Sequence, residues 1–149
     1  AGKKFNISPG CPNLIDRIEG GLMSYGNDFT KENNPYECNL EKYCKFDDHD
    51  FIGKKALEKI KKSRLKQKMR GVMFDGKPYK PNGKLLPVLS LSKKIIGRIT
   101  SGIFSPRIKK NIGLSMISKD YWKENQKVFV ETLDGKLVKG TITSLPFPK

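Results

Sequence analysis

The sequence predicts an α+β protein that ends in a small six-stranded antiparallel β-barrel. Two observations predict this. Residues 1–63 contain two short apolar patterns of helical period, one around Ile18 and one around Leu57. After a basic stretch at 61–64, six strand-like segments follow at roughly 10-residue spacing, with turn signals between them and no helix. We therefore place a domain boundary after Ser63, which divides the chain into units 1–63 and 64–149.

The first unit is expected to open with a short strand over 3–8 that ends in a turn. Pro12 suits the first turn of a helix, because its missing N–H has no partner there in any case. The apolar face of this helix carries Leu14, Ile15 and Ile18. Gly20 and Gly21 stop it directly after Glu19.

The rest of the first unit is expected to hold one strand and one helix. Residues 43–46 have the pattern of a half-buried strand. The acidic turn 47–50 precedes a helix over 51–60, where negative charge favours a helix N-terminus. Ala56, Leu57 and Ile60 form the apolar face of that helix.

The second unit contains the strands of the predicted barrel. They are expected at 68–74, 85–89, 94–101, 111–117, 128–132 and 137–143. Asp134 and Gly135 lie between the last two and are the clearest hairpin signal in the chain. Tyr121 and Trp122 precede the fifth strand, where we expect them to fill the core instead of stacking on bases.

Charge is distributed unevenly between the two units. The first carries 11 Lys and Arg residues against 10 Asp and Glu, whereas the second carries 19 against 5. Such a basic unit could attract nucleic acid, a membrane surface or a small anion. However, lysines outnumber arginines by 25 to 5, and arginine is the residue suited to bidentate readout of bases. We therefore expect a solvated lysine face and no specific nucleic-acid partner.

The sequence also indicates a reduced, cytoplasmic setting. Cys11, Cys38 and Cys44 are odd in number and form no C-x-x-C pair, which favours reduced thiols over disulfides. With one histidine, His49, and no paired cysteines, we expect no metal site. The acidic turn at 47–50 lacks the glycine and glutamate positions of an EF-hand. No run approaches the roughly 20 apolar residues that span a bilayer, and no secretory signal opens the sequence, so we expect no membrane partner.

Residues 16–28 are the stretch on which we expect a binding site. Glu19 lies at the predicted helix end, Tyr25 lies near a turn, and Gly20 and Gly21 lie between them. Glycine lets backbone or a flat ligand approach where a Cβ would block it. A carboxylate and a phenol beside bare backbone suit a planar heterocycle with ring N–H donors. The alternative is a capped helix and a tight turn with Glu19 solvated, and these residues alone leave both interpretations open.

Six short motifs follow one another along the chain. They lie at 17–21, 25–28, 35–37 with Leu40, 50–54 with 56–57, 97–106 and 146–147. In this order and at this spacing they resemble the C-terminal part of the folate-dependent aminomethyltransferase family, that of the glycine cleavage T-protein. Within the family, segments 8–13, 19–25, 33–38 and 110–114 are most similar to the branch that demethylates dimethylsulfoniopropionate.

The resemblance implies a function and a site. Members of that branch move a methyl group from a sulfonium substrate to tetrahydrofolate, the implied cofactor. Residues 1–63 would be the end of a mixed α/β folate-binding domain, and the barrel 64–149 would close the folate site. Glu19 would accept hydrogen bonds from the pterin ring, and Tyr25 would help to wall the same pocket.

The resemblance also implies what the chain lacks. The family's N-terminal half, with its substrate residues, is not in this sequence, so catalytic residues stay unknown and the chain alone is expected to be inactive. Many members enter the first barrel strand with an arginine that faces folate, and Lys66 and Lys68 are the candidates to replace it here. The alternatives are a glycine cleavage aminomethyltransferase and a non-enzymatic folate- or RNA-binding barrel.

Overall fold

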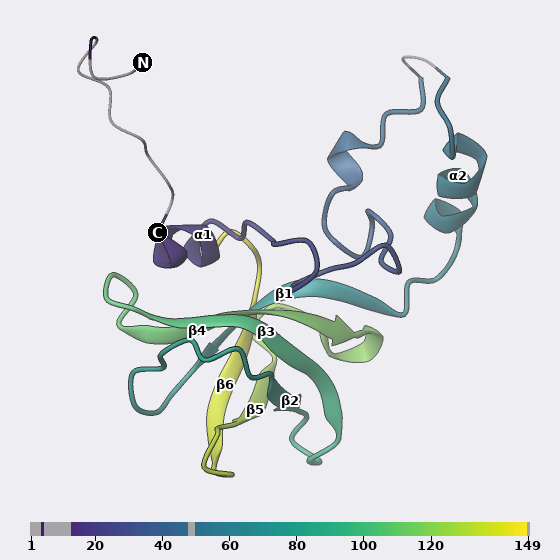
Figure 1. The fold of residues 1–149 in the computed structure, drawn as a ribbon. Coiled ribbons are helices and arrows are strands. Elements are labelled where there is room, and N and C mark those ends of the chain that lie inside the picture. The colour runs from purple at the N-terminus through teal and green to yellow at the C-terminus, as the bar shows by residue number, and fades with distance from the viewer. Residues whose placement is uncertain (1–3, 5–12, 48–49, 149) are drawn as a thin grey trace.

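A computed structural model of the chain describes residue 4 and residues 13–47 and 50–148. Its helical elements all lie outside the sheet (Figure 1): α1 (Leu14–Glu19), the 3-10 turns η2 (Glu41–Tyr43) and η3 (Lys119–Tyr121), and α2 (Lys54–Lys62). The strands are β1 (Gln67–Phe74), β2 (Leu86–Leu89), β3 (Ile95–Ser105), β4 (Lys110–Ser118), β5 (Lys127–Glu131) and β6 (Leu137–Thr143).

The six strands close into an antiparallel barrel in the order β1-β4-β3-β2-β5-β6, with β6 paired back to β1. This confirms the predicted barrel. The strand that differs most from expectation is β3, which continues to Ser105 because it pairs with β4 along the whole stretch. A register shift between Ile99 and Ser101 interrupts this pairing. Such a bulge re-aims the side chains beside it, and Ser101 belongs to the site described below.

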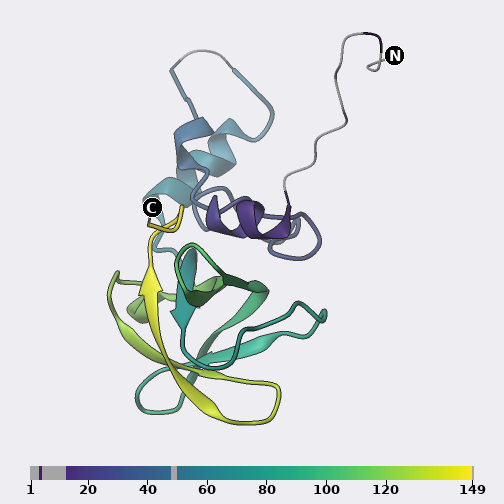
Figure 2. The same cartoon turned by 90° about the vertical axis from the view of Figure 1, so that its left-hand side faces the viewer.

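The barrel encloses one hydrophobic core and carries a second on its outer wall. The inner core is formed by Val72, Phe74, Leu86, Val88, Ile96, Ile99, Ile117, Val128, Val130 and Ile142. Tyr121 and Trp122 pack against it, which confirms their predicted role. The outer cluster joins Ile18 of α1 to Met69, Ile112 and Leu114 of the wall and to Phe147. Figure 2 shows α1 lying across the barrel, so β1 and β4 are covered on both faces.

Helix α1 forms where it was predicted, and both of its ends have identifiable causes. The Asn13 side chain caps the first turn by accepting a hydrogen bond from the Asp16 N–H (2.9 Å). At the other end Gly20 is the C-cap, and Gly21 adopts φ +69°, a left-handed conformation that favours glycine. Glu19 is therefore the last helical residue.

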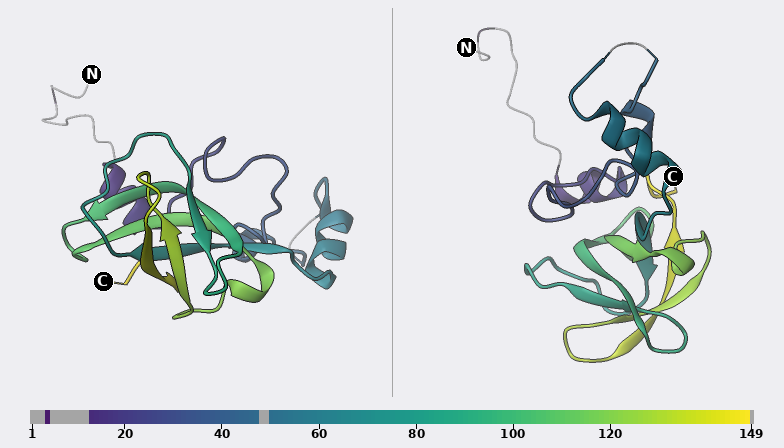
Figure 3. Two further views of the ribbon diagram at one scale, coloured as in Figure 1. Left: turned by 90° about the horizontal axis from the view of Figure 1, so that it is seen from below. Right: turned by 90° about the vertical axis from the view of Figure 1, so that its right-hand side faces the viewer.

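Two predictions for the first unit are wrong. No strand forms over 43–46, where the structure has the turn η2 followed by irregular chain. A strand requires a neighbour with which to pair, and no strand in the described part of the chain pairs with this segment. Helix α2 begins at Lys54 instead of residue 51, because Gly53 adopts φ +95° directly before it. Figures 1 and 3 show α2 standing away from the barrel.

Several other predictions fall outside the described residues. These are the strand 3–8, the roles of Pro12 and Cys11, and the single histidine His49. The two described cysteines, Cys38 and Cys44, are free thiols. Burial raises the pKa of Cys38 to about 11, so this thiol stays protonated. Within the described part of the chain, no helix is long and apolar enough to cross a membrane.

Candidate functional site

Glu19 lies where the end of α1 meets the C-terminal segment of the chain. The Phe147 N–H donates to the Glu19 carbonyl oxygen (2.9 Å). A Cβ on Gly21 would lie 3.0 Å from Leu145 Cβ, so glycine is needed here for both space and backbone conformation. The helix end is thus held tightly against the residues that follow β6.

The carboxylate of Glu19 is bound by Ser105, the last residue of β3, and by Arg107 of the turn that follows. The Ser105 hydroxyl donates to Oε1 (2.5 Å), and Arg107 Nε donates to Oε2 (2.7 Å). The hydrogen bond from Ser105 lowers the pKa of Glu19, burial opposes this, and the bond and charge of Arg107 lower it further. The side chain is 13% exposed, while that of Arg107 is 44% exposed. Glu19 is therefore an ionised, acceptor-only group and is not simply solvated.

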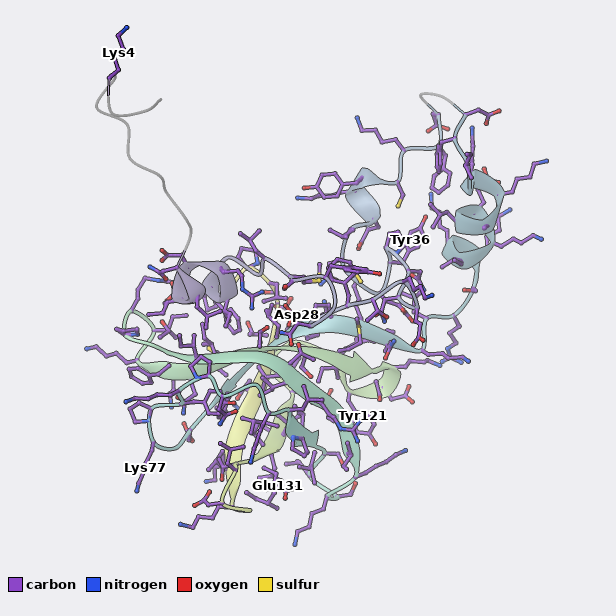
Figure 4. The ribbon with its side chains drawn as sticks, viewed as in Figure 1. Lys4, Asp28, Tyr36, Lys77, Tyr121 and Glu131 are labelled. Atoms are coloured by element: carbon purple, nitrogen blue, oxygen red, sulfur yellow. The ribbon has the colours of Figure 1, made fainter. Side chains whose placement is uncertain are left out.

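A second carboxylate from the same stretch, Asp28, is buried against β3. Its side chain accepts hydrogen bonds from the Ser24 N–H (2.8 Å) and from the hydroxyls of Thr100 (2.5 Å) and Ser101 (2.6 Å). Arg17 pairs with it (3.0 Å) and also donates to Ser101 Oγ (2.7 Å). Figure 4 places Asp28 between the loop after α1 and the barrel below it. We call these five residues the Asp28 network.

The two carboxylate clusters connect three of the six sequence motifs, those at 17–21, 25–28 and 97–106. Residues 17–28 supply Arg17, Glu19 and Asp28, and residues 100–107 supply their hydroxyl and guanidinium partners. The partners of both carboxylates were not predicted as site residues. The available signal was the group of hydroxyls in the motif at 97–106, since hydroxyls in a strand commonly bind polar groups that pack on it.

Tyr25, the other predicted site residue, has different interaction partners from Glu19 in the described residues. Its side chain is 67% exposed and makes an edge-to-face contact with Phe29, with ring centroids 5.6 Å apart. No contact joins Tyr25 to Glu19 in the described part of the chain. The structure therefore leaves the phenol available on the surface beside the Asp28 network.

The glycines after Glu19 border a hollow of mixed polar and apolar lining, which we call the glycine hollow. It has a volume of ≈ 200 Å³, and its lining includes Gly20, Gly21, Met23, Leu40, Tyr43 and Met69. This is smaller than the roughly 300–1,000 Å³ of complete ligand pockets. It presents glycine backbone and apolar side chains together with the polar side chains of Asn39 and Lys42. Neither Glu19 nor Tyr25 lines it.

The two lysines proposed to replace the family arginine differ in environment. Lys68 pairs with Glu41 (3.2 Å), whereas the side chain of Lys66 is exposed. The neighbouring Arg70 donates through Nε to the Trp122 carbonyl oxygen (2.8 Å), and burial lowers its pKa. Among these three cations, Lys66 is the one without a partner in the described residues.

Comparison with known proteins agrees with this architecture. The family model described as the glycine cleavage T-protein C-terminal barrel domain matches residues 67–149, more than half of the chain. The chain belongs to the glycine cleavage T-protein family. The matched range coincides with the strands β1 to β6 and the segment that reaches back to Glu19.

Relatives within the T-protein family carry two kinds of name. The chain is 38% identical over 91% of its length to dimethylsulfoniopropionate demethylase of Ruegeria pomeroyi, covering 36% of that protein. It is 36% identical over 99% of its length to an aminomethyltransferase of Thermoanaerobacter, covering 40%. The solved glycine cleavage system aminomethyltransferase T of Bartonella henselae superposes with a TM-score of 0.69 at 25% identity, over 90% of this chain and 37% of that one. The chain thus spans less than half the length of these relatives.

Proposed function

We propose that this chain is the C-terminal portion of a tetrahydrofolate-dependent methyltransferase that demethylates dimethylsulfoniopropionate. Membership of the T-protein family and the 38% identity to a demethylase of this name support the proposal. The observation that carries it is the Glu19 carboxylate, which is held ionised at the helix end by Ser105 and Arg107. Glu19 precedes in sequence the two glycines that line the glycine hollow but does not itself line it. Ionised acceptors beside bare backbone suit a flat ring that presents N–H donors.

In this proposal Glu19 anchors the pterin ring. An ionised carboxylate has about four lone-pair sites, and the bonds from Ser105 and Arg107 occupy two of them. The remaining sites can accept hydrogen bonds from a ligand, and such charge-assisted bonds are the stronger ones. Ser105 and Arg107 act as positioning residues that keep the carboxylate in place. Tyr25 contributes an exposed aromatic wall from the loop that the Asp28 network holds.

The contribution of these residues to the reaction is alignment. Tetrahydrofolate, when bound, supplies the N5 lone pair that takes the methyl group, while the electron pair of the broken bond stays on sulfur and the N5 proton is released. A sulfonium is already an activated methyl donor, so holding both reactants in line provides much of the rate enhancement. Glu19 and the glycine hollow would orient one of them, and no catalytic residue is assigned within this chain.

The rest of the site is proposed to come from the N-terminal half of the same enzyme. The glycine hollow is open and small, and the relatives are more than twice as long as the part that matches. We propose that residues 1–63 end a folate-binding domain, that residues 64–149 form the barrel domain, and that the enzyme works in the cytoplasm. Its small-molecule partners would be the sulfonium compound and folate.

Titration calorimetry with tetrahydrofolate tests the role of Glu19 in a protein that joins this chain to its N-terminal half. Glu19→Gln should weaken binding by about 1.5–3 kcal/mol, the range for a hydrogen bond to a charged group. Glu131→Gln is the matched control, since Glu131 lies at the lower end of the barrel in Figure 4. Unchanged affinity in Glu19→Gln would remove Glu19 from the site.

The second candidate function is that of a glycine cleavage aminomethyltransferase, whose methylene donor is an aminomethyl-lipoyl arm on a partner protein. The aminomethyltransferase of Thermoanaerobacter aligns with 99% of this chain, against 91% for the demethylase. Assaying the same full-length protein with each donor in turn, by the loss of tetrahydrofolate, separates the two. Turnover of the aminomethyl-lipoyl donor but not of dimethylsulfoniopropionate would replace the first proposal by the second.

A further inference from the structure

A second and larger hollow lies beside the β5–β6 hairpin of the barrel. It has a volume of ≈ 670 Å³ and lies between the loop 76–82 and the β5–β6 hairpin, and we call it the hairpin hollow. Figures 1 and 3 show these two segments near each other, and residues 79, 81 and 82 of the loop also border a smaller hollow lined by α1. The volume falls within the range of about 300–1,000 Å³ typical of small-molecule sites.

One wall of the hairpin hollow is fixed by a buried amide. Asn111 of β4 is 2% exposed, and its Nδ2 donates to the carbonyl oxygens of Lys77 (3.1 Å) and Asp75 (3.3 Å). Its Oδ1 accepts from the Tyr79 N–H (2.8 Å). The Phe104 N–H donates to the Tyr79 carbonyl oxygen (3.1 Å) and ties the same loop to β3. The loop is therefore a preformed wall and not a free connection.

The facing wall is a tight hairpin. The Thr132 N–H donates to the Lys136 carbonyl oxygen and the Gly135 N–H to that of Thr132, both at 2.9 Å. Asp134 accepts from the Thr132 hydroxyl (2.6 Å) and pairs with Lys136 (3.1 Å), so its charge is already compensated. The two walls approach each other at the back, where a Cβ on Gly76 would lie 3.5 Å from Val138 Cγ1.

The lining combines apolar surface with unpaired positive charge. Pro78, Tyr79, Pro81, Leu133 and Val138 provide the apolar part, and Leu133 remains 53% exposed. Lys77 and Lys80 line the same hollow, and no partner for either side chain is found in the described residues. Figure 4 shows Lys77 at the rim, reaching toward solvent. Exposed apolar surface favours a ligand with an apolar body, and free ammonium groups favour one with an acidic group.

We propose that the hairpin hollow is a second binding site, for a small amphipathic anion with a flat apolar body and one acidic group. The apolar body would lie against Tyr79, Pro81 and Leu133, and the acidic group would face Lys77 and Lys80 at the rim. The site shares no lining residue with the glycine hollow. It therefore stands independently of the folate proposal.

Amide chemical shifts of the 149-residue chain, titrated with 1-naphthoate at about 150 mM salt, test this proposal. We expect saturable shifts that cluster at 76–82 and 132–138. Leu133→Ser should weaken binding by about fivefold, because part of a leucine's contact area is lost. Leu91→Ser is the matched control, since Leu91 is 64% exposed and lies outside the hollow.

The charged rim is tested separately. Lys77→Gln combined with Lys80→Gln should weaken binding of 1-naphthoate by about three- to tenfold, the effect expected of two exposed charges. The same substitutions should leave binding of the neutral 1-naphthamide unchanged. Lys94→Gln combined with Lys123→Gln removes equal charge from exposed positions elsewhere and should have little effect. Shifts scattered over all lysines, no saturation, or equal losses in both double variants would overturn the proposal.

Discussion

Two carboxylates nine residues apart take different roles because their partners differ in exposure. Asp28 has a fully buried side chain, and its hydrogen-bond partners are an arginine, two hydroxyls, the Asn27 amide and a backbone N–H. Glu19 retains some exposure, and its ion-pair partner Arg107 is nearly half exposed. A buried carboxylate whose acceptor sites are filled by protein donors stabilises the fold. A partly exposed carboxylate keeps lone pairs that a ligand can use. We therefore assign Asp28 to stability and propose Glu19 for binding.

Replacing Asp28 by alanine should destabilise the chain strongly. The substitution leaves Arg17 and two hydroxyls without their acceptor in a largely buried place, so the free energy of unfolding should fall by about 3–5 kcal/mol. Urea unfolding measures this loss. Asp50→Ala is the control, because Asp50 is 95% exposed in its pair with Lys54 and should change stability by at most about 0.5 kcal/mol. Similar values for the two variants would show that the Asp28 network contributes little.

Glu19 should make stability depend on pH in the acid range. Its pKa in the folded chain lies below the ordinary value of 4.5, so the folded state favours the ionised form. This contribution is fully present above pH 4.5 and is lost as the pH falls through the folded pKa. Glu19→Gln removes it, so the stability difference between wild type and variant should shrink below about pH 4.5. Urea unfolding from about pH 7 to pH 3 tests this, and a difference independent of pH would contradict it.

At the scale of elements, the pair β3–β4 organises the site. Helix α1 has only six residues, too few to be stable alone, so it depends on packing against the barrel. Ile18 is buried against β4. Asp28 and Glu19 accept hydrogen bonds from hydroxyls of β3. The spacing of Ser101 and Ser105 along β3 thus sets how far apart the Asp28 network and Glu19 lie.

A close approach inside this strand pair gives a prediction at the same scale. A Cβ on Gly113 of β4 would overlap Ile99 Cγ2 and lie 3.1 Å from the Ser101 carbonyl oxygen. Gly113→Ala should therefore cost about 1–3 kcal/mol through overpacking, measured by urea unfolding. Gly102 pairs directly with Gly113, and its nearest neighbours would lie at 3.3 Å, so Gly102→Ala is the milder comparison. Equal losses in both variants would place the strain in the backbone and not in the contact with Ile99.

At the scale of the whole molecule, closure of the barrel gives the second unit a core of its own. All ten buried residues of the inner core belong to the strands. The outer cluster instead depends on Ile18 from the first unit. The boundary proposed after Ser63 therefore leaves the whole inner core in the second unit. It separates Ile18 from the other residues of the outer cluster.

A fragment of residues 64–149 should fold alone as an all-β domain. We expect a β-type circular dichroism spectrum and cooperative melting, because the inner core is complete within it. Its melting temperature should lie below that of residues 13–149, since removal of α1 uncovers Met69, Ile112 and Leu114. A non-cooperative melt of the shorter fragment would show that the barrel depends on its neighbour. Equal melting temperatures would show that α1 adds nothing to the stability of the wall.

The local sequence pattern was enough to predict those helix ends and strands that depend only on neighbouring residues. The strand expected at 137–143 has the bounds of β6, because alternation and the turn at Asp134 and Gly135 act within a few residues. The end of α1 at Glu19 was likewise predicted from the two glycines that follow it. The half-buried strand expected at 43–46 does not form. A strand also needs a partner strand, and the local sequence pattern carries no information about one.

Only the tertiary structure decided what surrounds the proposed site. Ser105 and Arg107 lie 86 and 88 residues beyond Glu19, and no local rule pairs residues so far apart. Barrel closure brings the β3–β4 turn under the end of α1, and this contact converts a carboxylate at a helix end into an ionised, positioned acceptor. Tyr25 contacts Phe29 and not the partners of Glu19, although both residues lie in one short stretch of sequence. Sequence proximity limits how far apart two side chains can lie, but packing decides which way each one faces.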